Sequence, residues 1–127
     1  MSAASNYTET LALTWLLTNS SATRPTAWHI ALFTSDPTDA GSGTEVSGTS
    51  YARQAVTFTV SGDTASNSAT VTFPAAGSNW GTIGWVGVYD NSTGGNLLFH
   101  GAVTTAKAID TGDTFQITSG NLDITLA

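Results

Sequence analysis

Residues 79–103, NWGTIGWVGVYDNSTGGNLLFHGAV, decide the fold of this chain. A strand over 82–89 would be polar on neither face, and such a strand belongs inside a sheet with material packed over each side. Residues 90–95 favour a turn, and a second apolar run follows at 97–99. The stretch therefore predicts a buried hairpin around which the other strands pack. Strict alternation would place Ile83, Trp85, Gly87 and Tyr89 on one face and Gly84, Val86 and Val88 on the other.

The composition favours one β-rich domain over residues 1–127. The 23 Thr and 14 Ser far outnumber the three basic and nine acidic residues, and such a balance suits half-solvated strands better than exposed helices. Alternating patterns recur at short spacing along the chain, with turn residues between them. About seven or eight strands are expected, which indicates an antiparallel β-sandwich or a jelly-roll-like barrel.

Two further regions give specific strand predictions. Residues 27–34 place Trp28, Ile30 and Leu32 on one face, with His29 on the other as a hydrogen-bonded structural residue. Apolar and polar residues alternate in the same way in residues 51–60 and 69–73. We therefore expect these segments to pair as a second hairpin through a polar connection at 61–68. Their predicted inward residues are Val56, Phe58, Val60, Val71 and Phe73.

The N-terminal region predicts a helix over about residues 6–18, capped by Ser5 or Asn6. Leu11 and Trp15 are four residues apart and belong to a broad apolar face. We expect this helix to cover one end of the sandwich. No basic residue precedes Arg24, which disfavours a secretory signal peptide, and the apolar run is too short for a membrane span.

Residues 35–50, SDPTDAGSGTEVSGTS, form the longest stretch without periodicity. Its Gly, Ser, Asp and Thr content indicates a flexible loop, or an arm ordered only by a partner. We expect contacts outside the fold here first.

Charge and residue types narrow the possible chemistry. A net charge of -6 leaves no surface that could neutralise phosphates, so no nucleic acid partner is expected. Without cysteine there is no disulfide, thiolate metal site or cysteine nucleophile. His29 and His100 do not complete a zinc site. The pairs Asp36 with Asp39 and Asp90 with Asn91 lack the spacing of a calcium loop and are better explained as turn residues.

One motif suggests catalysis. Residues 110–112, DTG, match the core of aspartic proteases, whose small dimeric members pool one Asp from each chain so that the carboxylates share a proton. Here Asp113 would add another negative charge beside the dyad, and a turn between strands explains the four residues equally well. We therefore expect no enzyme activity, no cofactor and no metal.

Seven short motifs occur in order over the C-terminal part of the chain. They are YARQ (51–54), FPAA (73–76), WGTI (80–83), VYD (88–90), GNLLFHG (95–101), GDTF (112–115) and LDITL (122–126). Together they resemble a family of small tailed-phage structural proteins, often labelled tail fibre proteins. The resemblance implies a non-enzymatic virion component, and we expect a homotrimeric decoration (cement) protein that binds between major capsid proteins on the outer capsid surface. The alternative is a tail or fibre piece that binds a host glycan or another tail protein. No membrane partner is implied.

An adhesive protein needs apolar anchors within its interface. We take the helix face, the 35–50 arm and one tryptophan near the central hairpin as candidates. The candidate interface residues are Leu11, Trp15, Asp36, Asp39, Glu45, Val46 and Trp80.

Overall fold

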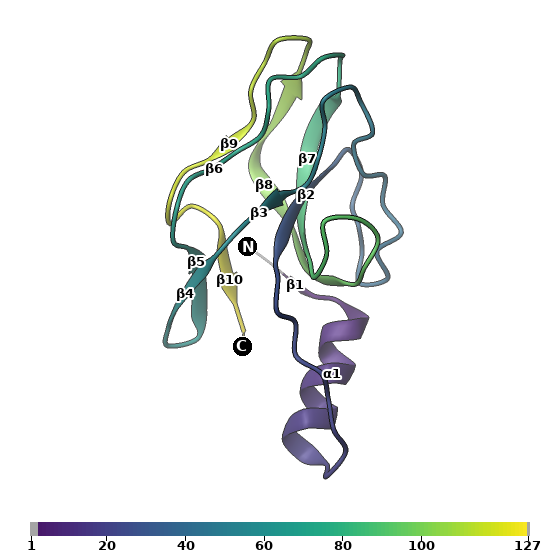
Figure 1. The fold of residues 1–127 in the computed structure, drawn as a ribbon, viewed down its shortest axis with the longest axis vertical. Coiled ribbons are helices and arrows are strands. Elements are labelled where there is room, and N and C mark those ends of the chain that lie inside the picture. The colour runs from purple at the N-terminus through teal and green to yellow at the C-terminus, as the bar shows by residue number, and fades with distance from the viewer. Residues whose placement is uncertain (1–2, 127) are drawn as a thin grey trace.

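The predicted central hairpin lies inside an antiparallel sheet (Figure 1). The computed structural model describes residues 3–126. Within them, β7 pairs with β8 on one side and with β2 on the other. The sheet has the order β1-β8-β7-β2-β3, with β1 at Ala3–Ala4, β2 at His29–Phe33, β3 at Gln54–Ala55, β7 at Gly81–Tyr89 and β8 at Leu97–Ile109.

Two smaller antiparallel sheets form the second layer (Figure 1). Apolar side chains from β2, β7 and β8 meet those of the second layer in one core cluster. The mainly β, antiparallel fold with an N-terminal helix confirms the predicted fold class. One sheet has the order β10-β5-β4, with β4 at Phe58–Ser61, β5 at Thr64–Asn67 and β10 at Asp123–Thr125; the other pairs β6 at Val71–Thr72 with β9 at Gln116–Ile117.

An irregularity between β7 and β8 interrupts the predicted alternation. Ile83 pairs with Lys107 and Trp85 pairs with Ala102, so the register shifts between these pairs and the extra residues lie in β8, between Ala102 and Lys107. As a result Ile83 lies in the same core cluster as Val86, while Trp85 packs on the opposite face. The prediction that Ile83 and Trp85 share a face is therefore wrong.

The opposite face of β7 is covered by loops. Phe33 and Tyr89 stack there with ring centroids 6.3 Å apart, and Leu97 joins them. Residues 35–50 fold back along β2, where Val46 N–H donates to the Leu32 carbonyl at 2.9 Å. The segment is thus held by bonds within the chain and does not project as an arm. Both faces of the hairpin are covered, as its apolar sequence predicts.

The predicted second hairpin is wrong in its pairing. The chain reverses at a two-residue turn, Gly62 and Asp63, so that β4 pairs with β5, a strand inside the expected polar connection. Gly62 has φ +62°, which suits such a turn. The strand β6 pairs with β9 instead. Among the predicted inward residues, Val56, Val71 and Phe73 are buried, Phe58 is half-buried, and Val60 is 71% exposed.

His29 also departs from its prediction. Its Nδ1 atom is buried and has no hydrogen-bond partner among the residues that the structure describes. The side chain is held by its place in β2, since His29 pairs with Tyr89 and Ala55 across the two neighbouring strands.

The helix α1 spans Asn6–Leu17 and extends away from the sheets (Figure 1). Ser5 is its N-cap and accepts a hydrogen bond from Thr8 N–H at 3.1 Å. Ser5 is also fully buried and donates to the Leu97 carbonyl, while Thr8 donates to Leu98. Only the first turn is fastened in this way, and no residue of α1 is buried. The expectation that the helix covers one end of the sandwich is therefore wrong.

Gly87 and Gly84 provide a test of the packing around β7. A Cβ at Gly87 would lie 2.9 Å from Leu97 Cδ1 and 3.0 Å from Phe33 Cε1, whereas a Cβ at Gly84 would meet nothing within 4 Å. We expect Gly87→Ala to lower the free energy of unfolding by about 1–3 kcal/mol because it overpacks the face. Gly84→Ala should change it by less than about 0.5 kcal/mol. Urea denaturation measures both, and equal losses would contradict the packing described.

Candidate interaction site

The C-terminal half of α1 is an exposed apolar surface. Leu13, Trp15, Leu16 and Leu17 are between 58 and 75% exposed. Thr14 is the one polar residue among residues 13–17, and a helix surface with so much apolar area is normally buried. Exposed apolar patches of this kind mark interaction sites. We refer to residues 13–17 as the helix end.

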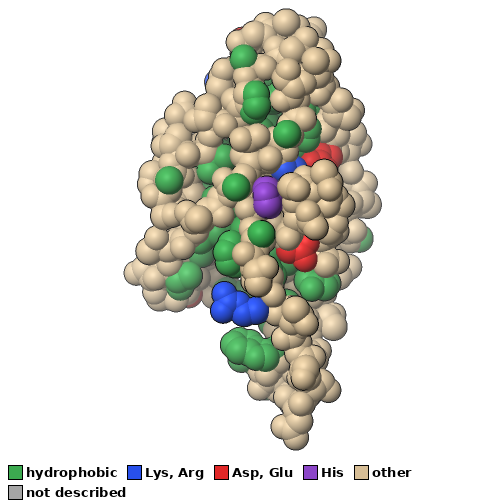
Figure 2. Space-filling view, viewed as in Figure 1, with side chains coloured by type: hydrophobic (Ala, Val, Ile, Leu, Met, Phe, Trp, Pro, Cys, Tyr) green, Lys and Arg blue, Asp and Glu red, His purple; other side chains and the backbone are tan. Residues whose placement is uncertain are grey.

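A shallow groove runs along one side of α1. Leu11 and Trp15 line it together with Ala22 and Arg24 from the segment that leads back to the sheets. Figure 2 shows a basic side chain beside apolar ones where the helix joins the body. Arg24 is exposed and makes no salt bridge with another residue within 3–126. The groove therefore combines an apolar floor with a positive charge.

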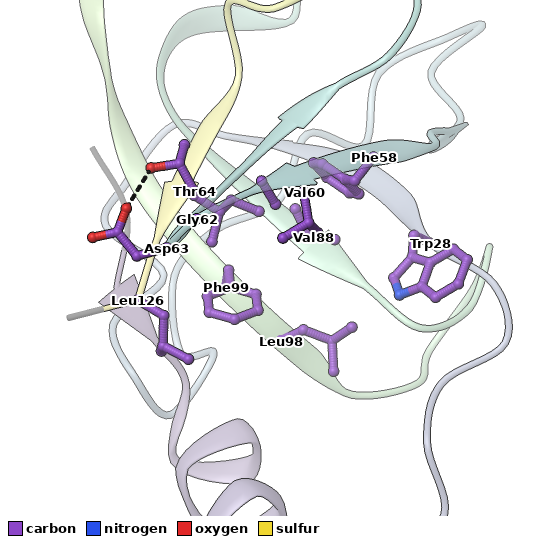
Figure 3. A pocket seen from close by; sticks show the side chains of 12 residues that line it. Trp28, Phe58, Val60, Gly62, Asp63, Thr64, Val88, Leu98, Phe99 and Leu126 are labelled. Carbon is purple, nitrogen blue, oxygen red and sulfur yellow. Dashed lines mark hydrogen bonds between the residues drawn. The ribbon is translucent and has the colours of Figure 1, made fainter.

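An open pocket of about 560 Å³ lies between the two layers, at the end of the sandwich where α1 begins (Figure 3). Val88, Leu98 and Ile124 form a buried cluster at its base. The space exists because β10 and β5 cover β7 and β8 incompletely at this end. We refer to it as the apolar pocket; its lining includes Trp28, Phe58, Val60, Phe99 and Leu126.

The apolar pocket has few polar groups. Asp63 and Thr64 line it, and Thr64 Oγ1 donates to Asp63 Oδ1 at 3.1 Å (Figure 3). Sites for small molecules are mostly apolar too, but they add several polar groups that converge on the ligand. No such convergence occurs here among the described residues, so apolar side chains are the better match for this space.

Glu45, a predicted interface residue, belongs to a structural network. Arg53 donates to both Glu45 carboxylate oxygens at 2.9 Å, and its guanidinium lies 3.7 Å from the centre of the Tyr89 ring. The same guanidinium donates to the carbonyls of Asn91 and Gly94. Such bidentate, stacked contacts are specific to arginine. The network fastens two loops over the outer face of the sheet.

Tyr51 completes this network. Its hydroxyl donates to Glu45 Oε2 at 2.6 Å and accepts from Leu32 N–H at 3.0 Å. Burial, followed by the hydrogen bond to Glu45, raises the pKa of Tyr51 far above its usual range. Burial alone would lower the pKa of Arg53, but the bond to Glu45 and its charge outweigh that effect and raise it. The YARQ motif therefore has a structural role.

Asp36 and Asp39 also hold a loop in place. His100 Nε2 lies 2.7 Å from Asp39 Oδ1, and His100 Nδ1 lies 3.9 Å from Asp36 Oδ1. Asp36 Oδ1 accepts from Thr38 N–H at 2.9 Å, as a turn residue does. Within residues 3–126, no group of three or more His, Cys, Asp or Glu side chains is arranged to hold a metal ion.

Val46 and Trp80 are core residues. They are 6% and 5% exposed, and Trp80 Nε1 donates to the Thr49 carbonyl at 3.0 Å. Neither side chain can serve as an exposed anchor. Trp80→Ala would remove core packing, so this substitution cannot test binding to a partner. Of the seven predicted residues, the structure leaves Leu11 and Trp15 beside an apolar groove.

Sequence reasoning missed the helix end beyond Trp15, and it missed the apolar pocket entirely. The helix end had a signal in the sequence, because Thr14 is the one polar residue among residues 13–17. The apolar pocket had none, since its lining comes from segments that are far apart in sequence.

The DTG motif lies in a turn that follows β8. Asp110 N–H donates to Asp113 Oδ2 at 3.0 Å, and Thr111 N–H donates to Asn79 Oδ1 at 3.0 Å. Gly112 has φ +89°, a conformation that glycine adopts without strain. These hydrogen bonds and this backbone conformation are those of a turn over residues 110–113.

Comparison with known proteins identifies a family. A family model described as podophage GP4 fiber I protein gp80 matches residues 3–125 of the chain. No curated protein matches it. In the described part of the chain, no helix has the length and hydrophobicity needed to cross a membrane.

Glu45→Gln tests the network around Arg53. The change leaves Arg53, whose side chain is 8% exposed, without its charged partner. We expect the free energy of unfolding to fall by about 1.5–3 kcal/mol, the usual range for a hydrogen bond to a charged group. Lys107→Gln removes an exposed charge from β8 and should change it by less than about 0.5 kcal/mol. Urea denaturation of the two variants gives the comparison; equal effects would exclude the role described for Glu45.

Alkaline pH tests the burial of Tyr51. Its pKa is raised in the folded protein, so the unfolded chain loses the phenolic proton first, and stability must fall as pH rises above about 10. Burial also raises the pKa of Tyr89, which adds to the slope. We expect Tyr51→Phe to be less stable than wild type at neutral pH and to show a shallower decline between about pH 9 and pH 11. Parallel slopes in urea denaturation would contradict the assignment.

Proposed function

The chain belongs to the family of podophage GP4 fiber I protein gp80, which makes it a tailed-phage virion structural protein, and we propose that it is a non-enzymatic, homotrimeric fibre subunit. Its function is adhesion between copies of itself and other virion proteins. The free energy comes from apolar surface that is buried on assembly.

One observation carries this proposal. The C-terminal half of helix α1 is almost entirely apolar and the helix has no buried residue, although the sheets enclose a buried core. Such a helix needs a protein surface to cover it. An enzyme of this size would instead be expected to gather its polar and titratable groups in a cleft. Here those groups fasten loops and turns.

The surface suits a symmetric assembly. Charged side chains are few on the face in Figure 2, and the chain carries only 12 charged residues, counting three basic and nine acidic. Symmetry brings identical patches together around an axis, so low charge density limits repulsion between like charges. This supports self-association, and the number of copies follows from the trimeric form that the sequence resemblance implies.

A decoration protein on the outer capsid surface, bound to the major capsid protein, is the second candidate. The exposed helix would serve that role as well, because it could cover a capsid protein in the same way. The family description names a fibre, and this favours the fibre role.

Labelling of phage particles distinguishes the two roles. We expect gold-labelled antibodies against this protein to bind at the tail, while antibodies against the major capsid protein, used as the control, bind at the head. Label distributed over the head would contradict the fibre role and support the decoration role. Negative-stain electron microscopy gives the distribution.

A further inference from the structure

The chain carries two apolar surfaces of opposite shape, the protruding helix end and the open apolar pocket. We propose that the helix end of one copy inserts into the apolar pocket of the next copy, and that this head-to-tail contact closes the subunits into a ring. The inference rests on the proposed function for the number of subunits, which is three. It adds the surfaces that hold them together.

The helix end does not reach the apolar pocket of its own chain. Ser5 N–H donates to the Leu98 carbonyl and Ala4 pairs with Phe99, so α1 begins at residues that line the pocket. From there the helix runs away from the sheets (Figure 1). At about 1.5 Å per residue, Leu16 lies about 15 Å along the axis from the start of the helix. The helix end therefore faces a neighbour.

The helix end and the apolar pocket are both lined by apolar side chains. Leucine and tryptophan side chains of the helix end need an apolar environment, and the pocket provides Trp28, Phe58 and Phe99 as its walls. Its volume of about 560 Å³ is within the range of about 300–1,000 Å³ that is typical of pockets for small-molecule ligands, so it has room for a leucine or tryptophan side chain. Three aromatic rings around the space also favour tight packing of an inserted aromatic or aliphatic side chain.

Residues of opposite charge lie beside the two apolar surfaces. Arg24 lies beside Trp15 in the groove along α1, and Asp63 lies at the rim of the apolar pocket. Both are exposed. When a helix end enters a neighbour's pocket, these opposite charges can meet across the contact. Complementary charges at an interface rim fix orientation more than they add affinity.

A contact between two different surfaces can close the subunits into a symmetric ring. The helix end and the pocket are different surfaces, so their contact is heterologous, and each copy retains one free helix end and one free pocket until the ring closes. A closed ring leaves neither surface exposed. Ring closure therefore explains how one small chain can carry a helix end and a pocket without assembling into open filaments.

The experiment separates the two surfaces by mutation. The helix variant carries Leu16→Asp and Leu17→Asp, and the pocket variant carries Val60→Asp; all three positions are more than 60% exposed, so the subunit fold should survive. A charge buried without a partner should weaken association at least about 100-fold in each variant. The control is Thr105→Asp, an exposed position of β8 outside both surfaces. Light scattering after size exclusion gives the mass, and circular dichroism checks the fold.

We expect the wild type and the control to be trimers and both interface variants to be folded monomers. A mixture of the two variants should form a one-to-one heterodimer, because it retains one intact helix end and one intact pocket. Leu126→Asp, at a second exposed pocket position, replaces Val60→Asp if that variant does not fold.

Three results would overturn the inference. A monomeric wild type would leave the pocket without this occupant. A pocket variant that remains trimeric while the helix variant dissociates would show that the helices pack on one another instead. Two monomeric variants whose mixture stays monomeric would show that the contact is not head-to-tail. If the wild type is a trimer and the pocket variant is also a trimer, the proposed contact is wrong but the fibre role is not affected. The position of the antibody label on the virion tests the fibre role separately.

Exchange of the rim charges tests the orientation. Arg24→Asp and Asp63→Arg should each weaken association by roughly 2- to 5-fold, as exposed ion pairs do, and the double variant should restore it. A double variant that is as weak as either single one would contradict the proposed docking. Sedimentation equilibrium measures the association constants.

Discussion

The fold depends on one constraint, which is that strand β7 is apolar on both faces. Its inner face is covered by the second layer, whose side chains form the main core cluster with Ile83 and Val86. Its outer face has no sheet over it. Loops close it, and the pair between Arg53 and Glu45 joins them across the edge of β2. The polar network thus has a packing role, because it holds backbone over an apolar surface that water would otherwise reach.

The way the helix and the second layer attach to the main sheet explains where the two proposed contact surfaces lie. The first turn of α1 is fastened to β8 by Ser5 and Thr8, so the helix is held at the edge of the main sheet and the rest of it extends outward. The second layer is built from strands of two to four residues, and these leave the sandwich open at the same end. Protrusion and pocket therefore come from one feature, an incomplete second layer beside an anchored helix.

The sequence predicted the parts of the fold that depend on local pattern. The alternation of β2, the hairpin of β7 with β8 and the N-terminal helix with its Ser5 cap are all present. The errors fall where pairing over long distances decides. The polar residues of β5 form a strand because β4 and β10 satisfy their backbone groups, and β6 finds its partner in β9. Composition gives no hint of such partners.

What the sequence determined by itself is the set of residues that must leave water and the regions where strands and the helix form. What only the tertiary structure decided is which apolar residues remain outside. Trp80 is in the core and Trp15 is at the surface, although Trp15 has the more apolar neighbours in the sequence. The physical reason is that burial depends on the other segments that reach a residue. The register shift between β7 and β8, the register of β6 with β9 and the outward path of α1 set those segments, and each arises from contacts between residues far apart in the chain.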